Sequence, residues 1–323
     1  MTKILGIGNA LTDILIRLDD DLQLNKLGLE KASMFLVDKD KADEILKFFN
    51  NKTKEIVSGG SACNAIHNIA RLGLETGYIG KIGHDEYGQH YVNDLKKAGI
   101  KSQMFYSEAL PSGTAIAMIS PDSERTFTTY LGASLELHAD DLHIDYFKGY
   151  DIIHLEGYLV QNHELVRRAI ILAKKAGLKI SADLPGFNVI KEDNDFVLEM
   201  IDSLDIVFAN EEEAKAIFNK TPEETLAFLA SKCEYAFVKL GANGSLAQHH
   251  NEKVRVEAKK VNAIDATGAG DAYAAGALYG ISKGFDTYST GKIGAVIAEN
   301  VIQTIGPKLS EKMWENIKEE LSI

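Results

Sequence analysis

The residues best suited to chemistry lie near the C-terminus, in the stretch Asn262–Ala277. Within it, Gly268-Ala269-Gly270 stands at the entry to a predicted helix rich in small residues. Glycines at such an entry let the backbone turn sharply and aim several N–H groups at one point, and the positive end of the helix adds to that field. Asp271 falls in the first helical turn. The segment therefore predicts a site for a phosphate or a developing anion, with a carboxylate beside it.

This helix entry has two interpretations. A short Gly-x-Gly alone would be explained as a helix start with a capping aspartate. The full string Asp265-Ala-Thr-Gly-Ala-Gly-Asp271, however, resembles the C-terminal signature of the ribokinase (PfkB) family of carbohydrate and nucleoside kinases. It is not a Rossmann fingerprint, because no acidic residue follows at the required offset after a second strand. Nor is it a Walker A loop, which needs Gly-Lys-Ser/Thr.

Four further motifs resemble those of the same family. Gly8-Asn-Ala-Leu-Thr-Asp13 is similar to the end of the family's first strand, and Gly59-Gly60-Ser-Ala-Cys-Asn64 to its N-terminal signature. Asn210-Glu-Glu-Glu213 resembles its Asn-x-x-Glu motif, and Lys239-Leu-Gly-Ala-Asn-Gly244 its nucleotide loop. All five motifs occur in the family's order, so the resemblance extends over nearly the whole chain and implies a ribokinase-like fold.

The resemblance also implies roles in catalysis. Asp271 would be the general base that takes a proton from a substrate hydroxyl as it attacks the γ-phosphoryl group of ATP. The N–H groups around Ala269, Gly270 and Asp271, in the loop that Gly268 opens, would stabilise charge on the transferring phosphoryl group.

Polar residues near the N-terminus are predicted to bind the substrate. Asp13 and Asn64 can each make paired hydrogen bonds to neighbouring hydroxyls, as a sugar diol requires. Gly59 and Gly60 would let the backbone approach the sugar closely. A strand-end turn for Asp13 and a helix-surface position for Asn64 stay open as structural alternatives.

Two further substrate contacts are predicted from their positions. Glu156 follows a predicted strand and falls where the resemblance implies a sugar-contacting glutamate. Arg125 lies on a predicted lid and could close over the substrate or a phosphate, the alternative being a solvated charge on a strand.

The nucleotide side is predicted from the two later motifs. The resemblance implies that Asn210 and Glu213 hold Mg²⁺ through water and contact the phosphates, although both can also serve as a helix N-cap. In the loop that Lys239 opens, Gly241 and Gly244 would pass under the nucleotide.

Two departures from the family pattern concern cofactors. Gly294-Ala295 stands where many members carry His or Asn near the adenine, so adenine would be held by apolar contact and backbone. Many members also bind a potassium ion beside the anion-binding loop. The residues at the corresponding positions are Asp265, Thr267, Thr304, Gly306 and Ser310.

The elements that must position these residues alternate along the chain, which predicts a doubly wound, mainly parallel sheet of the α/β class. The predicted strands are Lys3–Gly8, Thr76–Ile82, Ile152–Leu155, Lys179–Asp183, Ile206–Ala209 and Tyr235–Leu240. The predicted helices are Asp38–Asn50, Ser61–Leu72, Glu86–Ala98 and Glu164–Ala176, with residues 270–323 almost wholly helical.

Two regions break this alternation, at about residues 11–37 and 101–131, where strand-like stretches have no long helix between them. We expect one domain spanning residues 1–323, with a small discontinuous β lid made from these two segments. An exposed strand edge in such a lid could pair with a second copy. The expected state is therefore a monomer or a lid-mediated homodimer.

Composition excludes several classes of function. The 323 residues carry a formal net charge of -12, which disfavours a nucleic-acid or anionic-membrane surface. Two distant cysteines, Cys63 and Cys233, favour a reducing compartment over a disulfide framework. No run approaches the ~20 apolar residues of a membrane span, and the N-terminus carries no secretory pattern. We expect a cytoplasmic protein whose partner is a small molecule.

The substrate class stays broad. The Gly8–Asp13 opening is closer to adenosine kinases, whereas Glu156 favours ribokinase-like sugar recognition. We expect an ATP-dependent kinase that phosphorylates the primary hydroxyl of a sugar or nucleoside, with a ribose-containing substrate favoured. A non-catalytic sensor of nucleotide or sugar on the same fold is the alternative.

Overall fold

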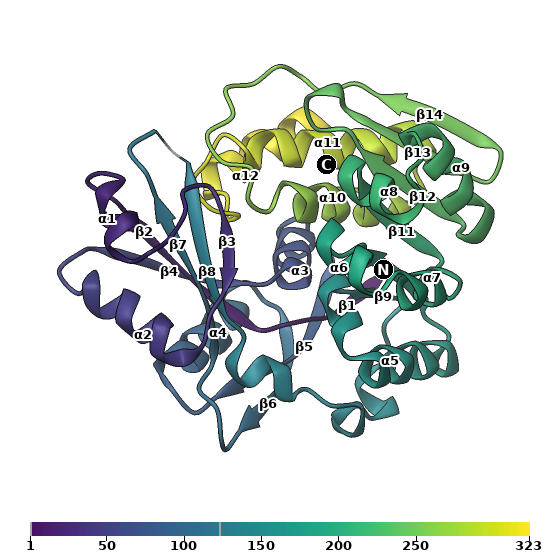
Figure 1. The fold of residues 1–323 in the computed structure, drawn as a ribbon. Coiled ribbons are helices and arrows are strands. Elements are labelled where there is room, and N and C mark those ends of the chain that lie inside the picture. Colours follow the sequence, from purple (N-terminus) through teal and green to yellow (C-terminus); the bar gives the residue numbers. More distant parts are fainter. Residues whose placement is uncertain (1, 123) are drawn as a thin grey trace.

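The computed structural model describes residues 2–122 and 124–323, whose strands form two separate sheets (Figure 1). Nine described strands make the large sheet: β1 (Lys3–Ile7), β5 (Glu75–Gly83), β6 (Lys101–Ser107), β9 (Ile152–Leu155), β10 (Lys179–Asp183), β11 (Ile206–Asn210), β12 (Tyr235–Lys239), β13 (Ser245–His249) and β14 (Glu252–Val256). They lie in the order β14-β13-β12-β11-β10-β9-β1-β5-β6. Every pair from β12 to β6 is parallel, and β13 and β14 add an antiparallel edge. The mainly parallel sheet predicted from the sequence is confirmed.

Helices cover both faces of the large sheet. On one face lie α3 (Ser61–Arg71), α4 (Glu86–Lys97), α10 (Ala269–Lys283), α11 (Thr287–Val301) and α12 (Glu311–Leu321). On the other face lie α5 (His163–Ala176), α6 (Phe187–Glu192), α7 (Asn194–Ile201), α8 (Glu211–Phe218) and α9 (Pro222–Lys232). Short 3₁₀ turns lie between them at η1 (Gly132–Glu136), η2 (Ala139–Asp141), η3 (Ile144–Tyr146), η4 (Gly157–Gln161) and η5 (Gly241–Asn243).

Alternating side chains of the strands produce the two cores. On β1, Ile4 packs with the α3 and α10 side, whereas Leu5 packs with the α5 side. On β11, Phe208 packs with the α3 and α10 side and Val207 with the α5 side. Because both faces are apolar, these strands are buried along almost their whole length, as parallel strands covered by helices usually are.

The second sheet stands beside the first and is built from two separate chain segments (Figure 1). Its strands, in the order β3-β8-β7-β2-β4, are β2 (Leu11–Arg17), β3 (Met34–Leu36), β4 (Lys54–Gly59), β7 (Gly113–Ile119) and β8 (Arg125–Tyr130). One face packs Ile14 and Ile116 against α1 (Leu22–Lys26) and α2 (Lys39–Phe48). The period of two along a strand places Asp13 on the opposite face. Helix α2 follows its N-cap Asp38, the first residue of the predicted helix, whose side chain accepts a hydrogen bond from the backbone N–H of Lys41.

The structure corrects the predicted composition of the second sheet. Lys101–Ser107 was expected in the lid, but it forms β6 and pairs in parallel with β5 of the large sheet. As an edge strand, β6 is only half-buried and mostly polar at its start, so its sequence lacks the apolar run of a central strand. Conversely, Lys54–Gly59, which carried no strand prediction, forms β4 and pairs with β2.

The described chain passes between the two sheets at short connections. It leaves β1 for β2 through Gly8–Ala10 and returns from β4 to α3 through Gly60. It crosses again between β6 and β7, and back at Leu131. Gly60 has a φ of 92°, and a Cβ there would lie 2.3 Å from the carbonyl oxygen of Asn9, so only glycine fits this crossing. Within the described residues, no helix has the length and apolarity needed to cross a membrane.

Candidate active site

The glycine-rich turn lies at the start of α10, as predicted. Gly268 adopts a left-handed conformation with φ 76°, and a Cβ on it would lie 2.6 Å from the Cβ of Pro307. Its neighbour Gly270 would place a Cβ 3.0 Å from the Nζ of Lys239. Side chains at these two positions would collide with Pro307 or Lys239, so the glycines allow the ammonium group to lie close to the N-terminus of α10, and this is a good environment for an anion.

Asp271 is held by two residues of α3. Its Oδ1 accepts a hydrogen bond of 2.7 Å from the Ser61 hydroxyl, and its Oδ2 accepts one of 2.9 Å from the Asn64 side-chain amide. Burial raises the pKa of Asp271 to about 6, although both hydrogen bonds act to lower it. The carboxylate is fixed in orientation and titrates within the range useful for a base at neutral pH.

The predicted Lys239 is part of a buried ion pair. Its Nζ lies 2.7 and 2.6 Å from the two carboxylate oxygens of Asp183, at the end of β10. Burial alone would lower the pKa of Lys239, but the carboxylates of Asp183 and Glu213 outweigh it, so the pKa is raised. The ammonium therefore stays charged between Asp183 and the glycine turn.

Asn210 and Glu213 form a reciprocal cap at the start of α8. The Asn210 side chain accepts from the backbone N–H of Glu213, and the Glu213 carboxylate accepts from the backbone N–H (2.8 Å) and side-chain amide (2.6 Å) of Asn210. Burial raises the pKa of Glu213 to about 8, with Asp183 adding to the shift and Lys239 opposing it. Asn210 and Glu213 thus do form the helix cap that was the structural alternative. The raised pKa shows that Lys239 only partly offsets the burial of the Glu213 carboxyl group.

Asp13 and Gly59 meet across the second sheet. Asp13 is 9% exposed on β2, and a Cβ on Gly59 would lie 2.1 Å from its Oδ1. Burial raises the pKa of Asp13 to about 7; the nearby charges of Lys308 and Arg125 lower it, and that of Asp271 raises it. The negative charges of Asp13, on the second sheet, and of Asp271, on helix α10 beside the large sheet, therefore lie close enough to interact.

Glu156 is buried and its carboxylate is bonded to protein groups. It is 3% exposed and accepts hydrogen bonds from the Asn9 side-chain amide (2.7 Å), the Asn9 backbone N–H (3.3 Å) and the Ala62 backbone N–H (3.2 Å). Burial raises its pKa to about 7. Glu156 thus joins the first crossing between the sheets to the start of α3.

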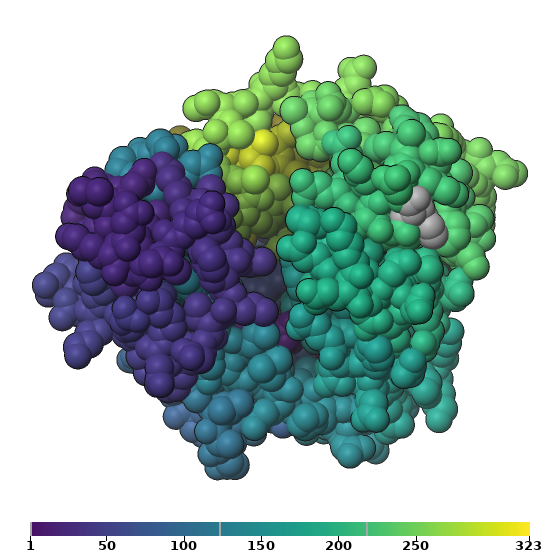
Figure 2. Space-filling view, in the orientation of Figure 1, coloured from purple at the N-terminus to yellow at the C-terminus, as the bar shows by residue number. Residues whose placement is uncertain are grey.

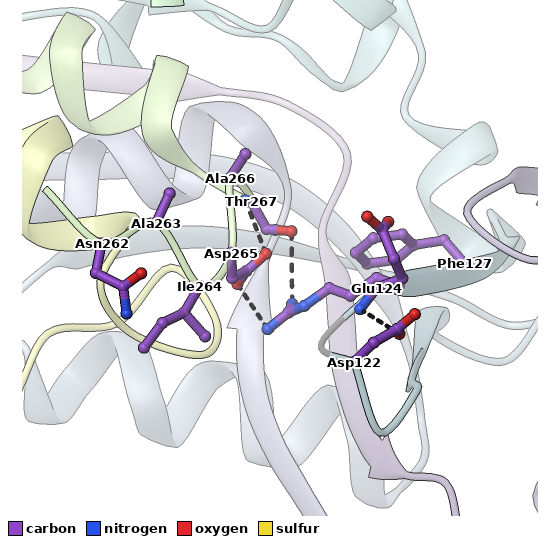
Figure 3. Close-up of a pocket in the computed structure, with 10 residues that line it drawn as sticks. Asp122, Glu124, Phe127, Asn262, Ala263, Ile264, Asp265, Ala266 and Thr267 are labelled. Atoms are coloured by element: carbon purple, nitrogen blue, oxygen red, sulfur yellow. Dashed lines mark hydrogen bonds and ion pairs between the residues drawn. The ribbon is translucent and has the colours of Figure 1, made fainter. Parts of the chain in front are cut away.

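Arg125 reaches the loop before the glycine turn. Its Nη2 lies 2.6 Å from the Oδ2 of Asp265, and its Nη1 donates to the Thr267 hydroxyl at 3.4 Å. These residues line a pocket of about 520 Å³ between β8 and residues 262–267 (Figure 3). The solvated alternative for Arg125 is therefore wrong, because its side chain is 7% exposed.

The remaining predicted residues have structural partners. Thr304 donates to the carbonyl oxygens of Val301 (2.9 Å) and Gly306 (3.2 Å), and Ser310 caps α12. Gly244, with φ 85°, would place a Cβ 2.0 Å from the Val256 carbonyl oxygen, so the turn requires glycine, whereas Gly241 faces open space.

The structure thus brings together the carboxylates Asp183, Glu213 and Asp271 and the ammonium of Lys239 at the carboxyl edge of the large sheet, the usual ligand position in open α/β sheets. Figure 2 shows a hollow between the N-terminal part that carries the second sheet and the C-terminal half. Sequence reasoning missed Asp183 and Ser61. The strand end at Asp183 and the one-turn spacing of Ser61 from Asn64 were signals for them.

Known proteins were then compared with this fold and site. The model of the pfkB family carbohydrate kinases matches residues 34–313. A probable sugar kinase from Rhizobium etli is 30% identical with a TM-score of 0.89, each chain covering 100% of the other. The adenosine kinase from Sinorhizobium meliloti is 31% identical with a TM-score of 0.88, over 99% of both chains.

An uncharacterized sugar kinase from Archaeoglobus fulgidus is 28% identical over 247 residues, which are 74% of this chain and 96% of the relative. The family match covers most of the chain, and the full-length structural relatives have the same two-sheet fold at 30% identity or more. The protein is therefore an enzyme that uses ATP for phosphoryl transfer, and the chain belongs to the pfkB family of carbohydrate kinases.

Proposed function

We propose that this kinase transfers the γ-phosphoryl group of ATP to the primary hydroxyl of a ribose-containing sugar or nucleoside, with Asp271 as the general base. The observation that carries the proposal is the placement of Asp271 at the open N-terminus of α10, held by Ser61 and Asn64. With a pKa of about 6, most of the carboxylate is ionised at neutral pH and can accept the hydroxyl proton. The N–H groups of Ala269 and Gly270 would stabilise charge on the moving phosphoryl group.

The substrate would lie between Asp13 and Asn64. The Oδ1 of Asn64 is buried and has no hydrogen-bond partner among the described residues. An unpaired buried acceptor is costly, and a substrate hydroxyl would satisfy it. Asp13 supplies a second acceptor from the opposite sheet, and Gly59 and Gly60 keep the backbone beside it free of side chains. Two such acceptors suit neighbouring hydroxyls on a sugar ring.

The nucleotide would bind across Lys239, Asn210 and the turn of Gly241 and Gly244. Asp183 contacts the ammonium of Lys239, and Glu213 and Asp271 lie close enough to interact with it, so carboxyl oxygens are available as ligands for Mg²⁺. Glu213 would hold the ion through water, and Mg²⁺ bound with ATP would neutralise charge on the β- and γ-phosphates. Lys239 would place its own charge beside the glycine turn. These residues fit a magnesium nucleotide.

The residues predicted for potassium do not fit a built cation site. The Asp265 carboxylate is already paired with Arg125 and with two backbone N–H groups. Thr304 donates its hydroxyl proton to two carbonyl oxygens, and Ser310 is occupied as a helix cap. No step of the mechanism is assigned to potassium.

We further propose that the second sheet is a lid that closes over the substrate and excludes water, which would otherwise accept the phosphoryl group. Its support is the set of short crossings, one of which requires glycine at Gly60. Hydrogen exchange with substrate and an ATP analogue should increase protection in residues 11–59 and 113–130 together. Protection of only one segment, or full protection of both in the free protein, would argue against a moving lid. The edge strand β3, with Met34 and Leu36 exposed, is the surface on which a lid-mediated dimer would form.

The activity itself is tested by measuring ADP formation from Mg-ATP with a panel of free sugars and nucleosides, with the same panel lacking Mg²⁺ as control. Turnover should be fastest with a substrate that offers a primary hydroxyl next to a ribose diol. Turnover confined to substrates without a ribose ring would refute the ribosyl proposal but leave the kinase assignment intact.

A further inference from the structure

An ion pair joins the second sheet to the loop that precedes the glycine turn. Arg125 begins β8, and Asp265 lies three residues before Gly268. The side chains are 7% and 3% exposed, and the Nη2–Oδ2 distance is 2.6 Å. Figure 3 draws dashed lines that reach Asp265 and Thr267. The pair therefore bridges two parts of the fold that are 140 residues apart in sequence.

Asp265 in turn shapes the loop. Its Oδ1 accepts the backbone N–H of Thr267 at 3.0 Å, and its Oδ2 accepts the backbone N–H of Gly306 at 2.7 Å. These bonds fix the peptide just before Gly268 and hold it against the segment after α11, where Pro307 contacts the Gly268 site. The orientation of the N–H groups that begin α10 thus depends on the Asp265 side chain being in place.

We propose that Arg125 is a positioning residue that acts through Asp265. Its guanidinium is the fixed cation of this loop, so the anion-binding turn is assembled when the second sheet docks and needs no monovalent metal ion. The proposal rests on the function of the glycine turn proposed above. In this proposal the guanidinium of Arg125, a residue of the second sheet, neutralises the Asp265 carboxylate, as a bound cation would otherwise do.

Electrostatics support this assignment. A carboxylate that is almost wholly buried needs a cation in contact with it, since removing one partner of a buried pair leaves an uncompensated charge. The guanidinium supplies that cation at Oδ2 of Asp265, the oxygen that also accepts the Gly306 N–H, and it donates to the Thr267 hydroxyl as well. A potassium ion on the same oxygen would meet a positive charge already in contact with it. The two cations therefore exclude each other.

The first test needs no substrate. Thermal unfolding is followed in KCl and in choline chloride at equal ionic strength, for the wild type, Arg125→Ala, and the control Arg167→Ala, which breaks an exposed pair with Glu199. The wild type and the control should unfold at the same temperature in both salts, whereas Arg125→Ala should be stabilised by K⁺. Equal stabilisation of all three proteins by K⁺, or no response of Arg125→Ala, would overturn the proposal.

The second test is kinetic and uses the substrate found in the panel above. Arg125→Ala should lose kcat by ~10–100-fold, the effect of misplacing catalytic groups by about an ångström, while KM for ATP changes little. Guanidinium chloride at millimolar concentration or KCl should restore part of kcat, and Arg125→Lys should keep most of it. Wild-type activity that requires K⁺ would refute the proposal. A wild type that phosphorylates nothing would instead refute the proposed function, and the thermal test would still decide the role of Arg125.

Discussion

The two sides of the hollow are held in different ways. At the carboxyl edge of the large sheet, Asp183, Lys239 and Glu213 are bonded to neighbours within the same body. On the opposite side, Asp13 stands on a sheet connected to that body by short crossings and by side-chain contacts such as Arg125 with Asp265.

This difference suggests that the nucleotide side and the substrate side of the site reach their working geometry at different stages. The nucleotide side has its charges fixed before any ligand arrives, which is the preorganisation that electrostatic catalysis needs. The substrate side acquires its geometry when the second sheet is docked. Substitutions on the first side should therefore change turnover and stability. On the second side, substitution of Asp13 should change substrate affinity, whereas Arg125 should affect turnover through its contact with Asp265.

The largest effect is expected at Asp271. Asp271→Asn should lower kcat by ~10²–10⁴, the usual contribution of a general base, while ATP binding is kept because the amide still fits between Ser61 and Asn64. Steady-state kinetics and ATP titration measure the two quantities, and Ser61→Ala serves as a milder control that removes one hydrogen bond to Asp271. A variant that keeps most of its kcat would contradict the catalytic assignment.

Next in size is the ion pair beneath the glycine turn. Lys239→Met should reduce the free energy of unfolding by about 3–5 kcal/mol, because Asp183 is left buried without its partner. The double variant Lys239→Met, Asp183→Leu should recover much of this loss in denaturant titrations. The exposed pair of Arg167 provides the control, and Arg167→Ala should barely change stability. Equal losses in the single and double variants would mean that the pair is not the cause.

The smallest effect is expected at the two residues proposed to bind the substrate. Asp13→Ala should weaken substrate binding by about 1–3 kcal/mol, the cost of leaving polar partners unpaired, with ATP affinity unchanged. Asn64→Ala should behave similarly in substrate binding but also lower kcat, since it frees one oxygen of Asp271. Calorimetric titration with substrate and with ATP separates the two ligands. Loss of ATP binding in Asp13→Ala would contradict the assignment of Asp13 to the substrate and of the large-sheet residues to the nucleotide.

Much of the nucleotide side could be predicted from the sequence because its residues follow strand ends or lie in short motifs. The strand Lys179–Asp183 and the turn before Asp271 were both predicted, since apolar runs and glycine spacing are local signals. The partnership of Asp183 with Lys239 was not, because the two residues end strands that lie 56 residues apart in sequence and on either side of β11, and only the sheet order brings these strand ends close together.

The lid side was harder to predict. Strand β6 was expected in the lid but lies in the large sheet, and β4 carried no strand prediction, because a half-buried polar strand at a sheet edge gives a weak pattern. Glu156 was located correctly after β9, but its bonds to Asn9 depend on a crossing that no periodicity describes. The Arg125–Asp265 contact likewise depends on how two sheets dock.

The pH dependence of kcat/KM tests the central role of Asp271 most directly. Because burial raises the pKa of Asp271 to about 6 and only the ionised carboxylate can accept a proton, the limb of the wild-type rate that belongs to Asp271 should fall as the pH drops through 6, below the range in which Asp13 and Glu213 titrate, near 7 and 8. The residual activity of Asp271→Asn should lack this acidic limb. An acidic limb near pH 6 that persists unchanged in Asp271→Asn would show that another group is the base.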